Sequence, residues 1–131
     1  MTDRLAPNFN SALVTGATGF LGSHLAGRLA DAGVRVTAIT RPSSDPARIA
    51  GLPNNVSVHA ATGDSRDLIE CFEQAKPDVV FHLAARFTAT HMPGDIAGLI
   101  EDNVTLTAQV CEAAGNAGCP ALVTAGTGWQ N

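Results

Sequence analysis

Short apolar runs alternate along the chain with longer segments in which apolar residues recur every three or four positions. The run Ser11–Thr15 predicts a strand, and it precedes a segment over 20–32 with Leu21, Leu25 and Leu29 at helical spacing. Gly33 follows that segment and predicts the end of the helix. An alternation of this kind is typical of α/β proteins, in which helices connect parallel strands.

The rest of the chain continues this pattern. We predict further strands over 34–40, 56–60, 79–83 and 121–124, and helices over 65–75 and 96–117, the latter with a candidate irregularity at Gly98. The connection over 42–53 has room for one helical turn around Arg48. Right-handed crossovers then give a doubly wound parallel sheet with strand order 3-2-1-4-5. We expect residues 1–10 to be a flexible lead-in and residues 11–131 to be one domain.

A glycine-rich turn follows the first predicted strand. Residues 15–22 read Thr-Gly-Ala-Thr-Gly-Phe-Leu-Gly, so Gly16, Gly19 and Gly22 lie three positions apart. Gly16 permits a sharp turn, Gly19 allows a phosphate to approach the backbone, and Gly22 allows close packing of the next helix. The start of that helix directs N–H groups toward an anion. The context indicates a Rossmann fold that binds a dinucleotide, although a glycine-rich turn without a ligand is the alternative.

Composition excludes several other classes of protein. The chain has 131 residues, 45% of them apolar, with a net charge of −4 and no basic run, which argues against a nucleic-acid partner. No apolar stretch reaches the roughly 20 residues of a membrane span, and the first ten residues do not resemble a secretory signal. The cysteines and histidines lack metal-ligand spacing, so we expect no metal site, and we expect reduced thiols in a cytoplasmic protein.

Four motifs carry a resemblance to a known family. Besides the glycine turn, the chain has Gly-Asp-Ser-Arg-Asp over 63–67, Phe-His-Leu-Ala-Ala over 81–85, and Asn-Val at 103–104 followed by Cys-Glu-Ala-Ala over 111–114. In this order the motifs resemble the N-terminal part of extended short-chain dehydrogenases/reductases. The resemblance is to their NAD-dependent epimerase/dehydratase group, which acts on nucleotide sugars, and it covers nearly the whole chain.

The resemblance implies roles for residues at two points of the cofactor site. Phe20 and Leu21 would offer backbone N–H groups to the pyrophosphate, while Asp64 and Ser65 would contact the adenine. Asp64 also suits a helix N-cap, and both roles can hold together.

A third set of implied contacts lies after the fourth strand. Leu83, Ala84 and Ala85 would line the cleft through their backbone, and Asn103 would brace the fourth strand or the cofactor region. We interpret His82 as a hydrogen-bonded core histidine.

The end of the second strand bears on the choice between NAD and NADP. An acidic residue normally holds the ribose 2′-hydroxyl of NAD there, but this chain reads Ile-Thr-Arg-Pro over 39–42. Arg41 is suited to a 2′-phosphate, so we favour NADP, with NAD as the alternative. Arg41 as a solvated loop residue is the other interpretation.

The segment after the fifth strand occupies the place of the family's catalytic serine or threonine. Residues 124–130 read Thr-Ala-Gly-Thr-Gly-Trp-Gln and depart from the common serine-rich pattern, which leaves the hydroxyl ambiguous. Thr127 is our first candidate and Thr124 our second. A threonine that only satisfies the strand end is the alternative.

The resemblance also implies a tyrosine and a lysine four residues apart on the next helix. The sequence has no tyrosine, and its one lysine, Lys76, precedes Pro77 at the end of a helix. We therefore expect a chain truncated after the fifth strand, with a dinucleotide site and an incomplete catalytic site. The complete form is expected to act on a nucleotide sugar, with a homodimer as one assembly. A reductase of small carbonyl compounds, a non-catalytic NADP-sensing module and an inactive remnant are the alternatives.

Overall fold

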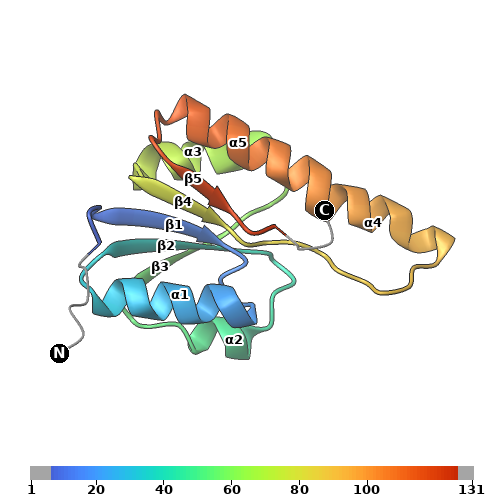
Figure 1. Ribbon diagram of the computed structural model, residues 1–131, viewed down its shortest axis with the longest axis horizontal. Coiled ribbons are helices and arrows are strands. Elements are labelled where there is room, and N and C mark those ends of the chain that lie inside the picture. Colours follow the sequence, from blue (N-terminus) through green and yellow to red (C-terminus); the bar gives the residue numbers. More distant parts are fainter. Residues whose placement is uncertain (1–6, 127–131) are drawn as a thin grey trace.

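Five parallel strands form one sheet at the centre of the molecule (Figure 1). The structure is a computed structural model that describes residues 7–126. The strands pair in the order β3-β2-β1-β4-β5, which confirms the predicted order 3-2-1-4-5. Their bounds are Ser11–Thr15 (β1), Arg35–Thr40 (β2), Val56–Ala60 (β3), Val79–His82 (β4) and Leu122–Thr124 (β5).

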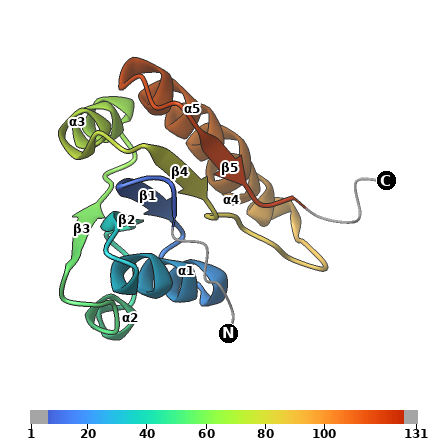
Figure 2. The same ribbon diagram turned by 60° about the vertical axis from the view of Figure 1, so that its left-hand side comes forward.

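Helices cover both faces of this sheet (Figure 2). One face carries α1 (Phe20–Asp31) and α2 (Pro46–Ala50), and the other carries α3 (Ser65–Ala75), α4 (Ile96–Ile100) and α5 (Leu106–Asn116). A short 3-10 turn, Pro93–Asp95, leads into α4. No helix within residues 7–126 is long and apolar enough to cross a membrane.

Two hydrophobic cores follow from the alternation of side chains along each strand. On β1, Ala12 and Val14 pack with Ala26 and Leu29 of α1, whereas Leu13 faces the opposite side of the sheet. The second core joins Leu13 to the helices α3 and α5 through the following buried residues: Leu68, Cys71, Phe72, Val110, Ala113 and Ala114. All five residues of β1 are buried, as expected for the central strand of a sheet covered on both faces.

The predicted helix over 96–117 is the element in which sequence and structure differ most. Its irregularity does not lie at Gly98; a π-helical turn, Glu101–Thr105, separates α4 from α5. Gly98 lies within α4, and a Cβ atom there would come within 2.5 Å of Nη1 of Arg86. This glycine makes room for an arginine side chain and does not bend the helix.

Candidate functional site

The glycine turn between β1 and α1 is held by backbone contacts that leave no room for side chains. Gly16 has a φ of +68°, and a Cβ atom on it would lie 2.7 Å from the backbone N of Ala84. A Cβ atom on Gly22 would lie 2.0 Å from the carbonyl oxygen of Gly16. Gly22 therefore allows the close packing predicted for α1, and the surface that the helix packs against here is the turn itself.

Gly19 differs from the other two glycines. Its Cβ atom would meet only the carbonyl oxygen of Gly16, at 3.2 Å, so the turn can accept a small side chain there. Gly19 is also the N-cap of α1, and no side chain caps it. The helix begins at Phe20 and Leu21, and the first N–H groups of a helix have no intrahelical acceptor. An approaching anion would meet these amides across the open side of Gly19.

A cleft of about 350 Å³ opens beside this turn, at the carboxyl ends of β1, β2 and β4. In this strand order the connections reverse direction between β1 and β4, which is where open α/β sheets bind ligands. Three chain segments contribute most of the wall, and the lining residues are Thr15, Gly16, Thr18, Gly19, Ile39, Thr40, Arg41, Ser43, Ser44, Ala61, Leu83, Ala84, Ala85 and Leu106.

Six of the predicted cofactor residues line this cleft, and six do not. Those in the wall are Gly16, Gly19, Arg41, Leu83, Ala84 and Ala85. Phe20, Leu21 and Gly22 begin α1 beside it, and Asp64 and Ser65 begin α3. Asn103 lines a second cavity of about 480 Å³, together with Thr107, Thr124 and the backbone after β4. Thr124, the second catalytic candidate, lies there, while Thr127 falls outside the described residues.

A chain of hydrogen bonds fixes the wall formed by Leu83 and Ala84. The hydroxyl oxygen of Thr15 accepts from the backbone N–H groups of Leu83 and Ala84, at 3.1 and 3.2 Å. Its own proton is therefore directed to Nδ1 of His82, 2.7 Å away. Nε2 of His82 then carries the proton and donates to the Thr107 hydroxyl at 2.9 Å. The relay ties three elements of the site together.

His82 is accordingly the hydrogen-bonded core histidine that the sequence indicated. It is only 4% exposed, and burial lowers its pKa from the usual 6.5. Thr107 donates in turn to the carbonyl oxygen of Asn103 at 2.8 Å. A protonated His82 would need Thr15 to accept a third hydrogen bond, so the neutral ring is the form that fits.

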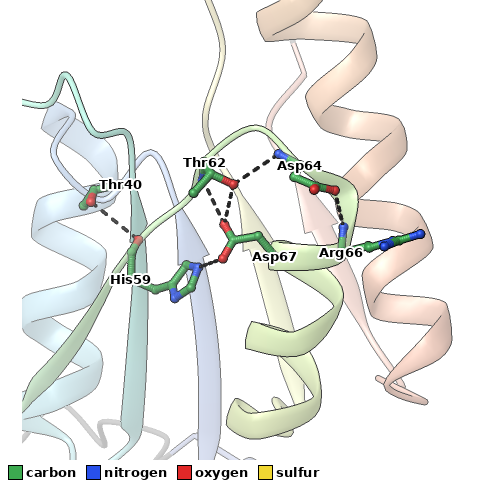
Figure 3. A network of polar contacts seen from close by, with 6 residues as sticks. All are labelled: Thr40, His59, Thr62, Asp64, Arg66 and Asp67. Carbon is green, nitrogen blue, oxygen red and sulfur yellow. Dashed lines mark hydrogen bonds and ion pairs between the residues drawn. The ribbon is translucent and has the colours of Figure 1, made fainter.

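The loop between β3 and α3 is organised by two carboxylates (Figure 3). Asp64 caps α3 by accepting from the backbone N–H of Arg66 at 2.9 Å, which confirms the N-cap interpretation. Asp67 accepts from the backbone N–H of Thr62 at 2.8 Å and contacts Nε2 of His59 at 3.0 Å. The bond from Thr62 is the main cause that holds the pKa of Asp67 below its usual 3.8. The second aspartate of the Gly-Asp-x-x-Asp motif thus fixes the loop that presents the first.

Arg41 does not lie free in solvent. Its Nη1 is 3.3 Å from Oδ1 of Asp102, a residue of the π-helical turn, and the other carboxylate oxygen accepts from Nε of Arg86 at 2.6 Å. Asn103 pairs with the backbone of Arg86 in both directions, at 2.8 and 2.9 Å. The Arg41 side chain is therefore partly exposed, at 47%, and is one of two arginines that share a carboxylate.

Sequence reasoning missed Asp102, Thr107 and Arg86. Asp102 and Thr107 flank the Asn-Val motif at 103–104, and Arg86 directly follows the Phe-His-Leu-Ala-Ala motif. Polar residues beside two such motifs were the available signal. The spacing of potential ligands gave no indication of a metal, and within residues 7–126 no group of three histidine, cysteine or acidic side chains is placed to hold a metal ion.

Comparison with known proteins identifies the family to which this site belongs. Residues 12–130 match the model of the NAD dependent epimerase/dehydratase family. The chain belongs to that family. The resemblance that the four motifs carried is therefore confirmed.

Curated relatives of this family member include two enzymes of nucleotide-sugar metabolism, judged by their names. The chain is 34% identical over 119 residues to UDP-glucose 4-epimerase of Mycolicibacterium smegmatis, which covers 88% of this chain and 38% of that protein. It is 34% identical over 113 residues to dTDP-glucose 4,6-dehydratase 1 of Escherichia coli, covering 79% of this chain and 30% of that protein. The chain thus spans 38% and 30% of the lengths of these two relatives.

Solved structures agree with this family assignment. UDP-glucose 4-epimerase of Thermotoga maritima, solved with UDP-glucose, matches with a TM-score of 0.80 at 26% identity, over 90% of this chain and 38% of that chain. UDP-glucose 4-epimerase of Thermus thermophilus, solved in complex with NAD, matches with a TM-score of 0.80 at 27% identity, over 90% of this chain and 38% of that chain.

Proposed function

We propose that the cleft beside the glycine turn binds a nicotinamide dinucleotide. The observation that carries this proposal is the shape of the turn: Gly16 and Gly22 have no room for a Cβ atom, whereas Gly19 faces an open cleft. A pyrophosphate would receive backbone N–H groups from Phe20 and Leu21 at the start of α1. The solved NAD complex of the Thermus thermophilus relative supports the same class of ligand.

Two further groups would hold the adenosine half of this ligand. Asp64 and Ser65 would contact the adenine. The hydrogen bonds of Asp67 to Thr62 and of Asp64 to Arg66 hold these two residues in place at the start of α3. Leu83, Ala84 and Ala85 would approach the ligand through their backbone, since they line the cleft and the Thr15 hydroxyl anchors two of their N–H groups.

We propose further that NADP is favoured over NAD. Arg41 lines the cleft at the end of β2, the position where dinucleotide-binding sheets select between the two cofactors. A guanidinium suits the 2′-phosphate of NADP, and the segment 39–42 offers no carboxylate for the 2′-hydroxyl of NAD. The NAD complex of the Thermus thermophilus relative makes NAD the alternative ligand.

The larger activity that we propose is oxidoreduction of a nucleotide sugar by hydride transfer, of the epimerase/dehydratase type. The dinucleotide would supply the hydride chemistry. The second cavity, which contains Asn103 and Thr124, is where we place the sugar, with Thr124 as a hydroxyl donor. Thr127 stays the first candidate for this role from the sequence alone. Asn103 would hold the boundary between the two cavities through its paired bonds to Arg86. A homodimer and a cytoplasmic location remain predictions from the sequence.

A binding function without catalysis is the second candidate. The 131 residues contain a cleft suited to a dinucleotide but no tyrosine, the residue that commonly exchanges the substrate proton in the proteins that this chain resembles. Both candidates share the dinucleotide site. Only the catalytic candidate predicts that the bound cofactor changes between its oxidised and reduced forms when a nucleotide sugar is added.

Titration with NADPH and NADH tests the shared site. We expect saturable enhancement of nucleotide fluorescence by the chain, and loss of at least about tenfold in affinity in Gly19→Val, whose branched side chain would occupy the open side of the turn. Gly27→Ala is the matched control, because a Cβ atom at Gly27 meets nothing within 4 Å. The absence of binding, or equal affinities in Gly19→Val and the unaltered chain, would overturn the proposal.

A further inference from the structure

We infer that Asp102 is a specificity-determining residue that limits how strongly Arg41 favours NADP over NAD. The inference rests on the proposed dinucleotide function of the cleft and goes beyond it, because Asp102 does not itself line that cleft. Its carboxylate lies between two arginines, with Oδ1 3.3 Å from Nη1 of Arg41 and Oδ2 2.6 Å from Nε of Arg86. Only 12% of its side chain is exposed, against 47% for Arg41.

Asp102 and Arg41 come from different elements that meet at the carboxyl ends of the strands. Arg41 follows β2, whereas Asp102 lies in the π-helical turn that joins α4 to α5. Arg86 holds the second oxygen, and its guanidinium packs over Gly98, where a side chain would displace it. The carboxylate is therefore fixed by Arg86, and its remaining oxygen is presented to Arg41.

This arrangement changes the charge that a 2′-phosphate would meet. Two arginines and one aspartate carry a net charge of about +1 where the two arginines alone would carry about +2. A 2′-phosphate bound by Arg41 has to share that guanidinium with Asp102, whose carboxylate already neutralises part of its positive charge. A 2′-hydroxyl carries no charge and is nearly indifferent to the carboxylate. Asp102 therefore weakens NADP binding selectively and leaves the preference for NADP modest.

The neighbouring acidic residue provides a matched control. Glu101 belongs to the same turn and has the same charge, but its side chain is exposed and it enters no ion pair within residues 7–126. Asp102→Asn and Glu101→Gln each remove one negative charge, so an effect of net charge alone would appear in both variants. An effect transmitted through Arg41 requires Asp102.

The test is the ratio of dissociation constants for NADH and NADPH, measured by fluorescence titration at low salt. We expect Asp102→Asn to raise the preference for NADPH by roughly five- to tenfold, with NADH affinity within about twofold of the unaltered chain. Glu101→Gln should leave the ratio unchanged within about twofold. A partial loss of folding lowers both affinities together and does not alter the ratio.

A double-mutant cycle separates an effect through Arg41 from a direct effect of the charge. In an Arg41→Ala background, Asp102→Asn should no longer change the ratio. An unchanged ratio in Asp102→Asn alone, or an equal shift with and without Arg41, would overturn the inference while leaving the dinucleotide site intact. Failure of the unaltered chain to bind either nucleotide would overturn the proposed function and this inference together.

Discussion

Two glycines of α1 should respond in opposite directions to the same substitution. Gly22 and Gly27 both lie within Phe20–Asp31, so an added methyl group has the same effect on helix propensity at each. In Gly27→Ala the methyl group enters open space. Alanine is favoured over glycine in a helix by roughly 0.5–1 kcal/mol, and we expect Gly27→Ala to stabilise the fold by about that amount.

In Gly22→Ala the methyl group meets the turn. Its carbon would lie 2.0 Å from the carbonyl oxygen and 2.7 Å from the carbonyl carbon of Gly16, and both are backbone atoms that no rotamer change can move. The helix or the turn must shift by more than about 1 Å to restore normal contact distances near 3.5 Å. Overpacking of this kind costs roughly 1–3 kcal/mol, which exceeds the propensity gain.

The assay is urea denaturation of the two variants and the unaltered chain, followed by circular dichroism. We expect the free energies of unfolding of Gly27→Ala and Gly22→Ala to differ by the overpacking cost of roughly 1–3 kcal/mol, with the unaltered chain between them. Equal stability of the two variants would refute the reasoning, because it would mean that α1 does not press on Gly16. Gly19→Ala, which meets only one atom at 3.2 Å, should be close to the unaltered chain in stability.

Three further predictions concern titratable groups. Burial lowers the pKa of His82, so the unfolded state takes up a proton at higher pH than the folded state, and the stability of the fold should fall as the pH drops below about 6.5. His82→Asn should flatten that fall when the free energy of unfolding is measured by urea titration across this pH range. An unchanged slope would contradict the assignment of the fall to His82. Asp67→Asn should lower the free energy of unfolding by roughly 1–2 kcal/mol at neutral pH. The difference from the unaltered chain should shrink as the pH falls below 3.8, because Asp67, whose pKa is lowered in the fold, stabilises it only while the carboxylate is charged. A difference that persists in acid would point to packing as its source. Burial raises the pKa of the Cys71 thiol to about 11, whereas Cys111 is exposed, so a thiol reagent at pH 8 should modify Cys111 rapidly and Cys71 only after unfolding, as peptide mapping would show.

The elements of the fold could be predicted because each one has its own periodicity. Leu13 and Val14 point to opposite faces of a sheet that helices cover on both sides, so β1 is a short apolar run, whereas apolar residues recur every three or four positions in the helices. The order of the strands follows from the handedness of the crossovers. The ends of the elements were located within a residue or two, because Gly33, with a φ of +83°, and the Asp64 cap are local signals.

The contacts that tune the site could not be predicted in this way. Asp102 meets Arg41 only after the sheet has brought β2 near the π-helical turn, and neither residue has a neighbour in sequence that marks the pair. The same holds for Thr15 and His82, which are joined by the pairing of β1 with β4. Gly98 shows the converse, because a glycine inside a helix suggested an irregularity but serves to accommodate a side chain from another segment.

The π-helical turn rotates the two halves of one long helix relative to each other about the helix axis. An α-helix advances by roughly 100° per residue, so a turn with one extra residue rotates everything before it by about that angle relative to everything after it. After the turn, Thr107 faces His82 and Val110 lies in the core with α3. Within the turn, Asp102 and Asn103 face Arg86, and before it Gly98 lies against the guanidinium of Arg86. Removal of one residue from Glu101–Thr105 would bring the two halves into a single setting. The helix could then satisfy its core packing or its contacts with the arginines, but not both at once.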